Sequence, residues 1–304
     1  FIHRLYCDVV VFSNCSIQYN DIFRRVCDII NVYNHEFLFE GSFFDRFYAL
    51  FDLIHNQQYY KKFVKVIIST EYGRNPRNNQ TLLGLLSNDT KKYQLIFKEE
   101  QKNLEDLIKI FINFSTIFNL ISKQDDYNFF FQKLFLPNIE IMERHSEFLF
   151  TNQATTPFAL TFILTVIKGE SRIQFPKHSA NGILLFRSTM KFLCCFYKHL
   201  HSHANDNNIG NYLKCVHRSL KIYNTIITAK YVMFRVLQIY NDSTLINSIQ
   251  SITNFLMQFK LKNLFSFPKL GLQLKSLAVN LFEKHHKEVF MMEPPVIHFL
   301  FTIL

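Results

Sequence analysis

Apolar residues along this chain recur at the spacing of a helix face, and this periodicity constrains its fold more than any other feature. One set lies at i, i+4, i+7, i+11 and i+14: Leu107, Phe111, Phe114, Phe118 and Ile121. Residues at this spacing line one side of an α-helix, because a helix turns once in about 3.6 residues. Comparable sets occur within residues 183–197, 245–259 and 270–281. The sequence therefore predicts a succession of amphipathic helices.

Composition agrees with a helical chain. Only 7 Gly and 7 Pro occur in 304 residues, and 48% of the residues are hydrophobic. So few turn formers argue against a many-stranded sandwich or barrel, and the hydrophobic content argues against disorder. We expect helices at about residues 18–35, 42–55, 57–69, 100–122, 127–149, 154–168, 180–202, 210–228, 243–259, 269–288 and 294–304.

The expected helices form antiparallel pairs that start near residues 103, 155 and 210. This interval of about 45–55 residues is close to the period of HEAT repeats. We therefore predict an all-α HEAT/armadillo-like solenoid that spans residues 1–304 as one repeat segment. A loop-rich stretch is expected near residues 70–93, and a break at Pro137 within the 127–149 helix.

The net charge of +10 admits nucleic acid or an anionic membrane as a partner. However, the cations occur in scattered pairs such as Lys61-Lys62 and Lys91-Lys92, which argues against nucleic-acid binding. The longest apolar runs, such as residues 157–167, are shorter than the roughly 18 residues that a membrane span needs. We expect no membrane insertion.

The sequence lacks the motifs of common catalytic sites. Neither a Gly-rich phosphate loop nor HExxH nor GxSxG occurs. The acidic pair Asp125-Asp126 is typical of a helix start, where carboxylates are favoured by the helix dipole. We therefore predict no enzyme, no catalytic, cofactor-binding or metal-binding residues, no cofactor and no small-molecule substrate.

One set of side chains has the residue types of a metal site. Cys195, His199 and His203 lie at i, i+4 and i+8, so the outer two are about 12 Å apart along the helix axis, too far to share one ion. We predict a core cysteine beside histidines at a fraying helix end, and reduced, buried cysteines generally. His285-His286 is interpreted as the polar end of a helix. Phe43-Phe44 and residues 129–131 are interpreted as core rather than as pockets for a partner peptide.

The most specific stretch is residues 172–187, Arg-Ile-Gln-Phe-Pro-Lys-His-Ser-Ala-Asn-Gly-Ile-Leu-Leu-Phe-Arg. An extended connector with Pro176 leads into a helix whose apolar face begins at Ile183. This segment resembles one in the exportin-7 (Ran-binding protein 16) branch of the importin-β nuclear transport receptors. Further resemblances follow the family's order at residues 103–119, 129–136, 155–157, 231–242, 245–256, 267–270 and 293–297.

The resemblance covers about residues 100–304, whereas residues 1–99 match only at 44–53. Two departures stand out: Arg235 replaces a small residue, and Asn56-Gln57-Gln58 occupies the place of an acidic run. Thr155, Thr156 and Pro157 resemble a family helix start, where threonine can cap and proline fits the first turn. Arg187 is expected to pair within the repeat or to face a partner.

The resemblance implies a nuclear export receptor that binds protein cargo together with Ran-GTP, contacts nucleoporins, and shuttles between nucleus and cytoplasm through the nuclear pore. It also implies that this chain is a fragment of a longer receptor and lacks the N-terminal Ran-binding repeats. The alternative is a HEAT-repeat scaffold without a transport role, in trafficking or with nucleic acid. An enzyme's accessory or catalytic α-domain is the third possibility.

Overall fold

The computed structural model describes residues 61, 64, 91, 93–97, 103–121, 124–168, 173, 175, 179–204 and 209–304. The chain falls into two compact units, residues 1–89 with 119–121, and residues 90–118 with 122–304. Almost all described residues belong to the second unit. The helices expected at 18–35, 42–55 and 57–69 therefore lie outside the described residues apart from Lys61 and Val64, which are helical. The loop expected at 70–93 lies outside them too, except that Lys91 and Tyr93 are helical.

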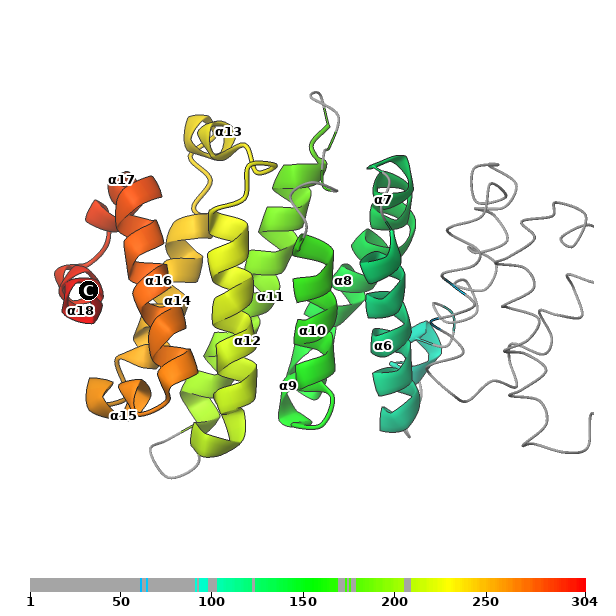
Figure 1. Cartoon of the computed structure of the whole chain (residues 1–304), viewed down its shortest axis with the longest axis horizontal. Helices are drawn as coiled ribbons and strands as arrows, with labels where there is room; N and C mark the ends of the chain where they lie inside the picture. Colours follow the sequence, from blue (N-terminus) through cyan, green and yellow to red (C-terminus); the bar gives the residue numbers. More distant parts are fainter. Residues whose placement is uncertain are drawn as a thin grey trace, which may run out of the picture. The chain divides into compact units, whose positions relative to one another are not determined.

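Helices and their short connectors make up the described part of the second unit (Figure 1), which contains no strand. In chain order they are α6 (Leu104–Leu120), α7 (Gln124–Phe130), the π-helix η3 (Phe131–Phe135), α8 (Leu136–Arg144), α9 (Ser146–Thr151), α10 (Thr156–Ile167), α11 (Asn181–His203), α12 (Ile209–Ile227), α13 (Phe234–Ile239), α14 (Thr244–Leu256), α15 (Leu261–Phe265), α16 (Pro268–Lys284), α17 (His286–Phe290) and α18 (Pro294–Ile303).

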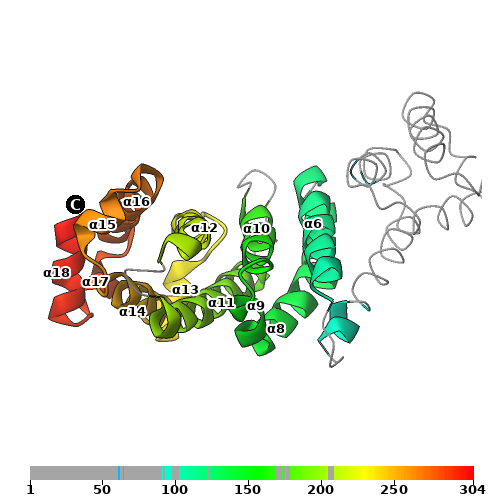
Figure 2. The same cartoon turned by 90° about the horizontal axis from the view of Figure 1, so that it is seen from below.

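The long helices of this unit lie in two rows (Figure 2). One row runs α6, α10, α12, α16, and the other runs α8 and α9, α11, α14. Successive helices of a row pack against one another: α12 against α10, α16 against α12, α11 against α8 and α9, and α14 against α11. The described helices thus confirm the predicted all-α helical-repeat fold.

Phenylalanine fills the space between the first helices of this unit. The Phe162 ring lies 5.6 Å from that of Phe114 and 6.0 Å from that of Phe118. Phe130 and Phe131 are buried, as predicted, whereas Phe129 is half-buried. Each buried phenylalanine stabilises the fold by about 1.5–3 kcal/mol through loss of apolar surface from water. Phe43-Phe44 lies outside the described residues.

The predicted break at Pro137 is wrong. The chain stays helical through Pro137, which occupies the first turn of α8, and a π-helical turn of residues Phe131–Phe135 precedes it. Such wider turns occur within helices where the α-helical hydrogen bonding is interrupted, and proline carries no N–H to donate. The helix ends instead at His145, whose φ of −109° and ψ of 24° leave the helical region.

The two threonines at the start of α10 do not cap it. The hydroxyls of Thr155 and Thr156 donate to the carbonyl oxygens of Leu149 and Asn152, at 2.7–3.3 Å. These acceptors lie at the end of α9, where helix carbonyls lack intrahelical partners. Pro157 does occupy the first turn of α10, as predicted. The hydroxyls therefore complete the preceding helix rather than the following one.

Two buried tyrosine–serine pairs connect successive helices of the two rows. Tyr197 of α11 lies 2.7 Å from the Ser219 hydroxyl of α12, and Tyr223 of α12 lies 2.6 Å from the Ser248 hydroxyl of α14. Each serine donates its single hydrogen to a carbonyl of its own helix. Each tyrosine must therefore be the donor to the serine oxygen. Burial raises the pKa of both phenols, so both hydroxyls keep their protons.

Candidate functional site at the junction of α11 and α13

The two sequence segments with the most distinctive resemblance, residues 181–187 and 231–242, lie against one another. The rings of Phe186 and Phe234 meet edge to face, 5.3 Å apart. Arg187 Nε lies 3.1 Å from a carboxylate oxygen of Asp242. The start of α11 and the connector that contains α13 therefore form one packed junction, although about 50 residues separate them in the chain.

Gly182 allows this approach. A Cβ atom at this position would overlap the carbonyl oxygen of Tyr231 and would lie 3.2 Å from its carbonyl carbon. The hydroxyl of Tyr231 also donates to the carbonyl oxygen of Ile167, at 3.1 Å. Tyr231 therefore contacts its surroundings through both its backbone, against Gly182, and its hydroxyl, on Ile167. Only glycine at position 182 leaves room for α11 beside the connector.

Asn241 terminates α13 in a way that positions Asp242. Its φ of 49° lies in the left-handed region, which asparagine tolerates better than most residues. The N–H of Asp242 donates to the Leu237 carbonyl at 2.8 Å, and that of Asn241 to the Gln238 carbonyl at 3.1 Å. This is the hydrogen-bond pattern of a Schellman motif. The chain turns here so that Asp242 lies at the start of α14.

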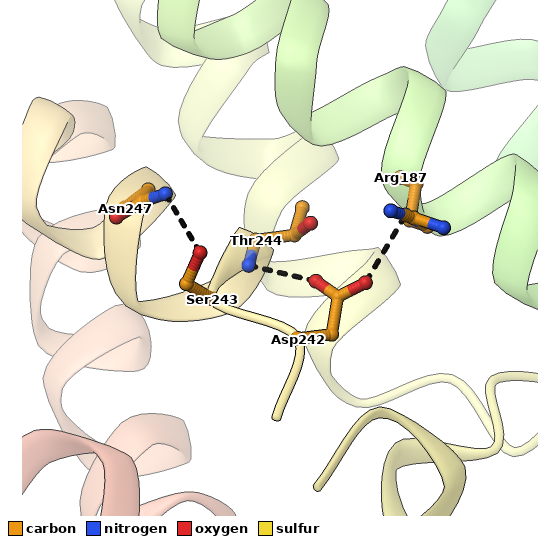
Figure 3. A network of polar contacts seen from close by, with 5 residues as sticks. All are labelled: Arg187, Asp242, Ser243, Thr244 and Asn247. Atoms are coloured by element: carbon orange, nitrogen blue, oxygen red, sulfur yellow. Dashed lines mark hydrogen bonds and ion pairs between the residues drawn. The ribbon is translucent and has the colours of Figure 1, made fainter. Parts of the chain in front are cut away.

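Asp242 joins three elements of the junction (Figure 3). One carboxylate oxygen accepts the Thr244 N–H at 2.8 Å, at the first turn of α14, and the other pairs with Arg187 of α11. Desolvation acts to raise the pKa of Asp242, but the hydrogen bonds from Thr244 and the Arg187 charge outweigh it and hold the pKa below its usual value. Arg187 thus forms the expected ion pair within this part of the chain, while half of its side chain stays exposed.

The interpretation of His285 as a polar helix end is wrong. The side chain is only 3% exposed, and its Nε2 lies 2.8 Å from the Ile227 carbonyl oxygen at the end of α12. A carbonyl only accepts, so Nε2 carries the hydrogen. The ring also meets Phe234 at 4.5 Å, edge to face. Burial lowers the pKa of His285, so the imidazole is neutral at pH 7. His286 is exposed.

A pocket of about 280 Å³ lies beside this junction. It is formed where α12 and α16 end and α13 begins. Arg235, the position that departs from the family pattern, is among its lining residues. The complete lining is Ile227, Thr228, Ala229, Phe234, Arg235, Gln238, Lys284 and His285.

The structure does not assemble the Cys195, His199 and His203 set into a metal site. No group of three potential ligands occurs among the described residues. Cys195 is half-buried rather than in the core, as is Cys194, whereas Cys215 is buried; none of the three forms a disulfide. His203 ends α11 as predicted, and its ring stacks on that of His199 at 4.2 Å.

The other sequence candidates keep structural roles. Asp125 and Asp126 lie in the first turn of α7, as predicted. No helix among the described residues has the length and apolar character to cross a bilayer. Cys7, Cys15 and Cys27 lie outside the part of the chain that the structure describes.

Comparison with known proteins agrees with the sequence resemblance. The chain is 25% identical over 209 residues to Exportin-7-B of Xenopus laevis, a match that covers 67% of this chain and 19% of that protein. It is 24% identical over 229 residues to Ran-binding protein 17 of Mus musculus, covering 74% of this chain and 20% of that protein. Exportin-7 of Dictyostelium discoideum is 26% identical over 233 residues, covering 66% and 22%.

The chain therefore spans about a fifth of the length of the curated relatives it matches. No family model matches the chain, and no solved structure matches it. These relatives are exportins and a Ran-binding protein. The predicted resemblance is confirmed: the curated relatives of this chain are exportin-7 and Ran-binding protein 17, which are members of the exportin-7 branch of the nuclear transport receptors.

Proposed function

We propose that this chain is part of a nuclear export receptor of the exportin-7 type. The receptor binds protein cargo together with Ran-GTP, contacts nucleoporins, and shuttles between nucleus and cytoplasm. The similarity to exportin-7 and Ran-binding protein 17 over two thirds of the chain carries this proposal. The structure supports it with stacked helix pairs, the architecture from which repeat proteins build long binding surfaces.

Such a receptor acts through binding alone. Cargo and Ran-GTP each bind more tightly when the other is present, and this coupling is reciprocal. No covalent step is required, in keeping with a chain whose relatives are transport receptors. The chain matches only about a fifth of each relative. We propose, from the family resemblance, that these 304 residues are cargo-side or ring-closing repeats and that the Ran-binding repeats belong to another part of the receptor.

The test is a pull-down of the full-length protein with Ran in its GTP-bound and GDP-bound forms. We expect retention of Ran-GTP and little retention of Ran-GDP, with Ran-GTP retention increasing when cargo is added. The 304-residue chain alone serves as the matched control and is expected to retain neither form. Equal retention of both forms by the full-length protein, or of neither, would contradict the receptor and favour a HEAT-repeat scaffold without a transport role.

A further inference from the structure

Large apolar side chains are exposed on α13 and α17, two short helices at the same edge of the unit (Figure 1). Ile239 is 75% exposed and Tyr240 80% exposed at the end of α13, while Phe290 and Met291 are 60% and 74% exposed at the end of α17. Gln238 of α13 donates to the Glu288 carboxylate at 2.6 Å, so the helices are neighbours. Exposed apolar side chains gathered in one region are typical of an interaction surface.

The pocket next to these side chains has a positive lining. Arg235 and Lys284 line it, both are exposed, and no carboxylate is among the lining residues. Asp242 pairs with Arg187, whereas the Glu288 carboxylate accepts a hydrogen bond from Gln238, a lining residue, and so places one negative charge at the rim of the pocket beside the two cations. Among the described residues, neither Arg235 nor Lys284 forms an ion pair. The pocket therefore favours an anionic group.

We propose that this edge binds an acidic peptide segment of a partner protein. A carboxylate of the segment enters the pocket and pairs with Arg235 and Lys284, and an adjacent apolar side chain packs on Ile239 and Tyr240. Arginine suits this role because its planar guanidinium matches a carboxylate with two parallel hydrogen bonds. A volume of about 280 Å³ accommodates an acidic side chain but lies below the usual range for drug-sized ligands.

A protein segment fits this surface better than a nucleic-acid strand. A strand would need a groove of cations along its backbone, whereas here a pair of cations adjoins exposed aliphatic and aromatic side chains. Peptide binding here requires neither Ran nor nucleotide, so the inference goes beyond the proposed transport function and can fail independently of it.

The experiment is fluorescence anisotropy of the 304-residue chain with a labelled short peptide of Asp, Glu, Leu and Phe. The same peptide with Asn and Gln in place of its acids, and a labelled oligothymidylate of equal charge, are the comparison probes. We expect the acidic peptide to bind about tenfold more tightly than the amide peptide, a difference that one charged contact can supply. Equal binding of the two peptides would overturn the proposal.

The charge test uses two double variants of equal net charge. Arg235→Glu with Lys284→Glu is expected to weaken binding of the acidic peptide at least about tenfold. Lys260→Glu with Lys262→Glu places the same change at α15, by the opposite end of α16, which is 17 residues or about 25 Å long. This control is expected to bind within about twofold of the unmodified chain. If both double variants lost the same peptide affinity, the peptide would be attracted by the net charge of the chain rather than by this pocket, and the proposed site would be overturned.

The apolar contact is tested in the same assay. Tyr240→Ser is expected to weaken binding about tenfold, and Leu272→Ser, at a 67% exposed residue of α16, is expected to leave it unchanged. A different outcome is that oligothymidylate binds more tightly than the peptide and that the Arg235→Glu, Lys284→Glu variant loses this binding. That outcome would overturn the peptide proposal and identify nucleic acid as the ligand of the site. The full-length Arg235→Glu, Lys284→Glu variant should still retain Ran-GTP, which separates failure of this site from failure of the transport function.

Discussion

Two glycines at equivalent helix positions provide a stringent test of the α11 junction. Gly182 and Gly210 are each the second residue of a long helix, α11 and α12. A Cβ at Gly182 would overlap the Tyr231 backbone, whereas a Cβ at Gly210 would have no neighbouring atom within 4 Å. Alanine should therefore have opposite effects at the two positions, although the local helix geometry is the same.

The magnitudes follow from crowding and from helix propensity. Carbon atoms pack at about 3.5–4.0 Å, so Gly182→Ala forces the α11 start away from Tyr231. Such crowding costs about 1–3 kcal/mol, and alanine regains at most about 1 kcal/mol in a helix. We expect Gly182→Ala to lose about 1–2 kcal/mol and Gly210→Ala to gain about 0.4–1 kcal/mol.

The assay is urea unfolding of the 304-residue chain, followed by far-ultraviolet circular dichroism and supplemented by thermal melting. For a chain of 304 residues, a difference of about 2 kcal/mol between the variants corresponds to roughly 3 °C in melting temperature. If Gly182→Ala proves as stable as Gly210→Ala, then the close approach of α11 to the Tyr231 carbonyl does not exist, and the packed junction is refuted.

Two further predictions concern pH. Asp242→Asn keeps an acceptor for Thr244 but loses the ion pair, and should cost about 1 kcal/mol at pH 7. Because the folded-state pKa of Asp242 is lowered, its contribution is present above about pH 4 and is lost as the pH falls further, so urea midpoints of protein and variant should converge in acid. The folded-state pKa of His285 is also lowered, so folding of the native chain loses stability as the pH falls below about 6.5. The His285→Gln side chain can still donate to the Ile227 carbonyl, so the urea midpoint of this variant should depend less on pH between pH 7 and 5 than that of the native chain. An unchanged pH dependence would contradict a buried neutral imidazole at His285.

The sequence predicts the long helices well because each buries a continuous apolar face. The expected helices at 180–202, 210–228 and 294–304 agree with α11, α12 and α18 to within one residue at each end. These boundaries are local: Pro294, for example, begins α18 at its first turn. The helix expected at 269–288 starts within one residue of α16, which begins at Pro268, but α16 ends earlier than expected, at Lys284.

The junction could not be predicted, because its determinants are distant in sequence. The helix α13 has only 6 residues, too few for periodicity to show, and its stability comes from the turn at Asn241 and from packing on α11. His285 leaves the helix of α16 to reach the Ile227 carbonyl, 58 residues earlier in the chain. No local sequence pattern predicts this contact between His285 and Ile227. The negative charge of Asp242 just before Thr244 was the one visible signal, since acidic residues favour helix starts.

The buried tyrosine–serine pairs restrict how this part of the chain can deform under load. Sliding one helix along its neighbour by even a residue, about 1.5 Å, would strand the hydroxyl of Tyr197 or Tyr223 without a partner, at a cost of about 1–3 kcal/mol each. Changing the angle between the same helices about the hydroxyl contact leaves the bond intact. The stack joined by α11, α12 and α14 should therefore be stiff in shear and compliant in bending.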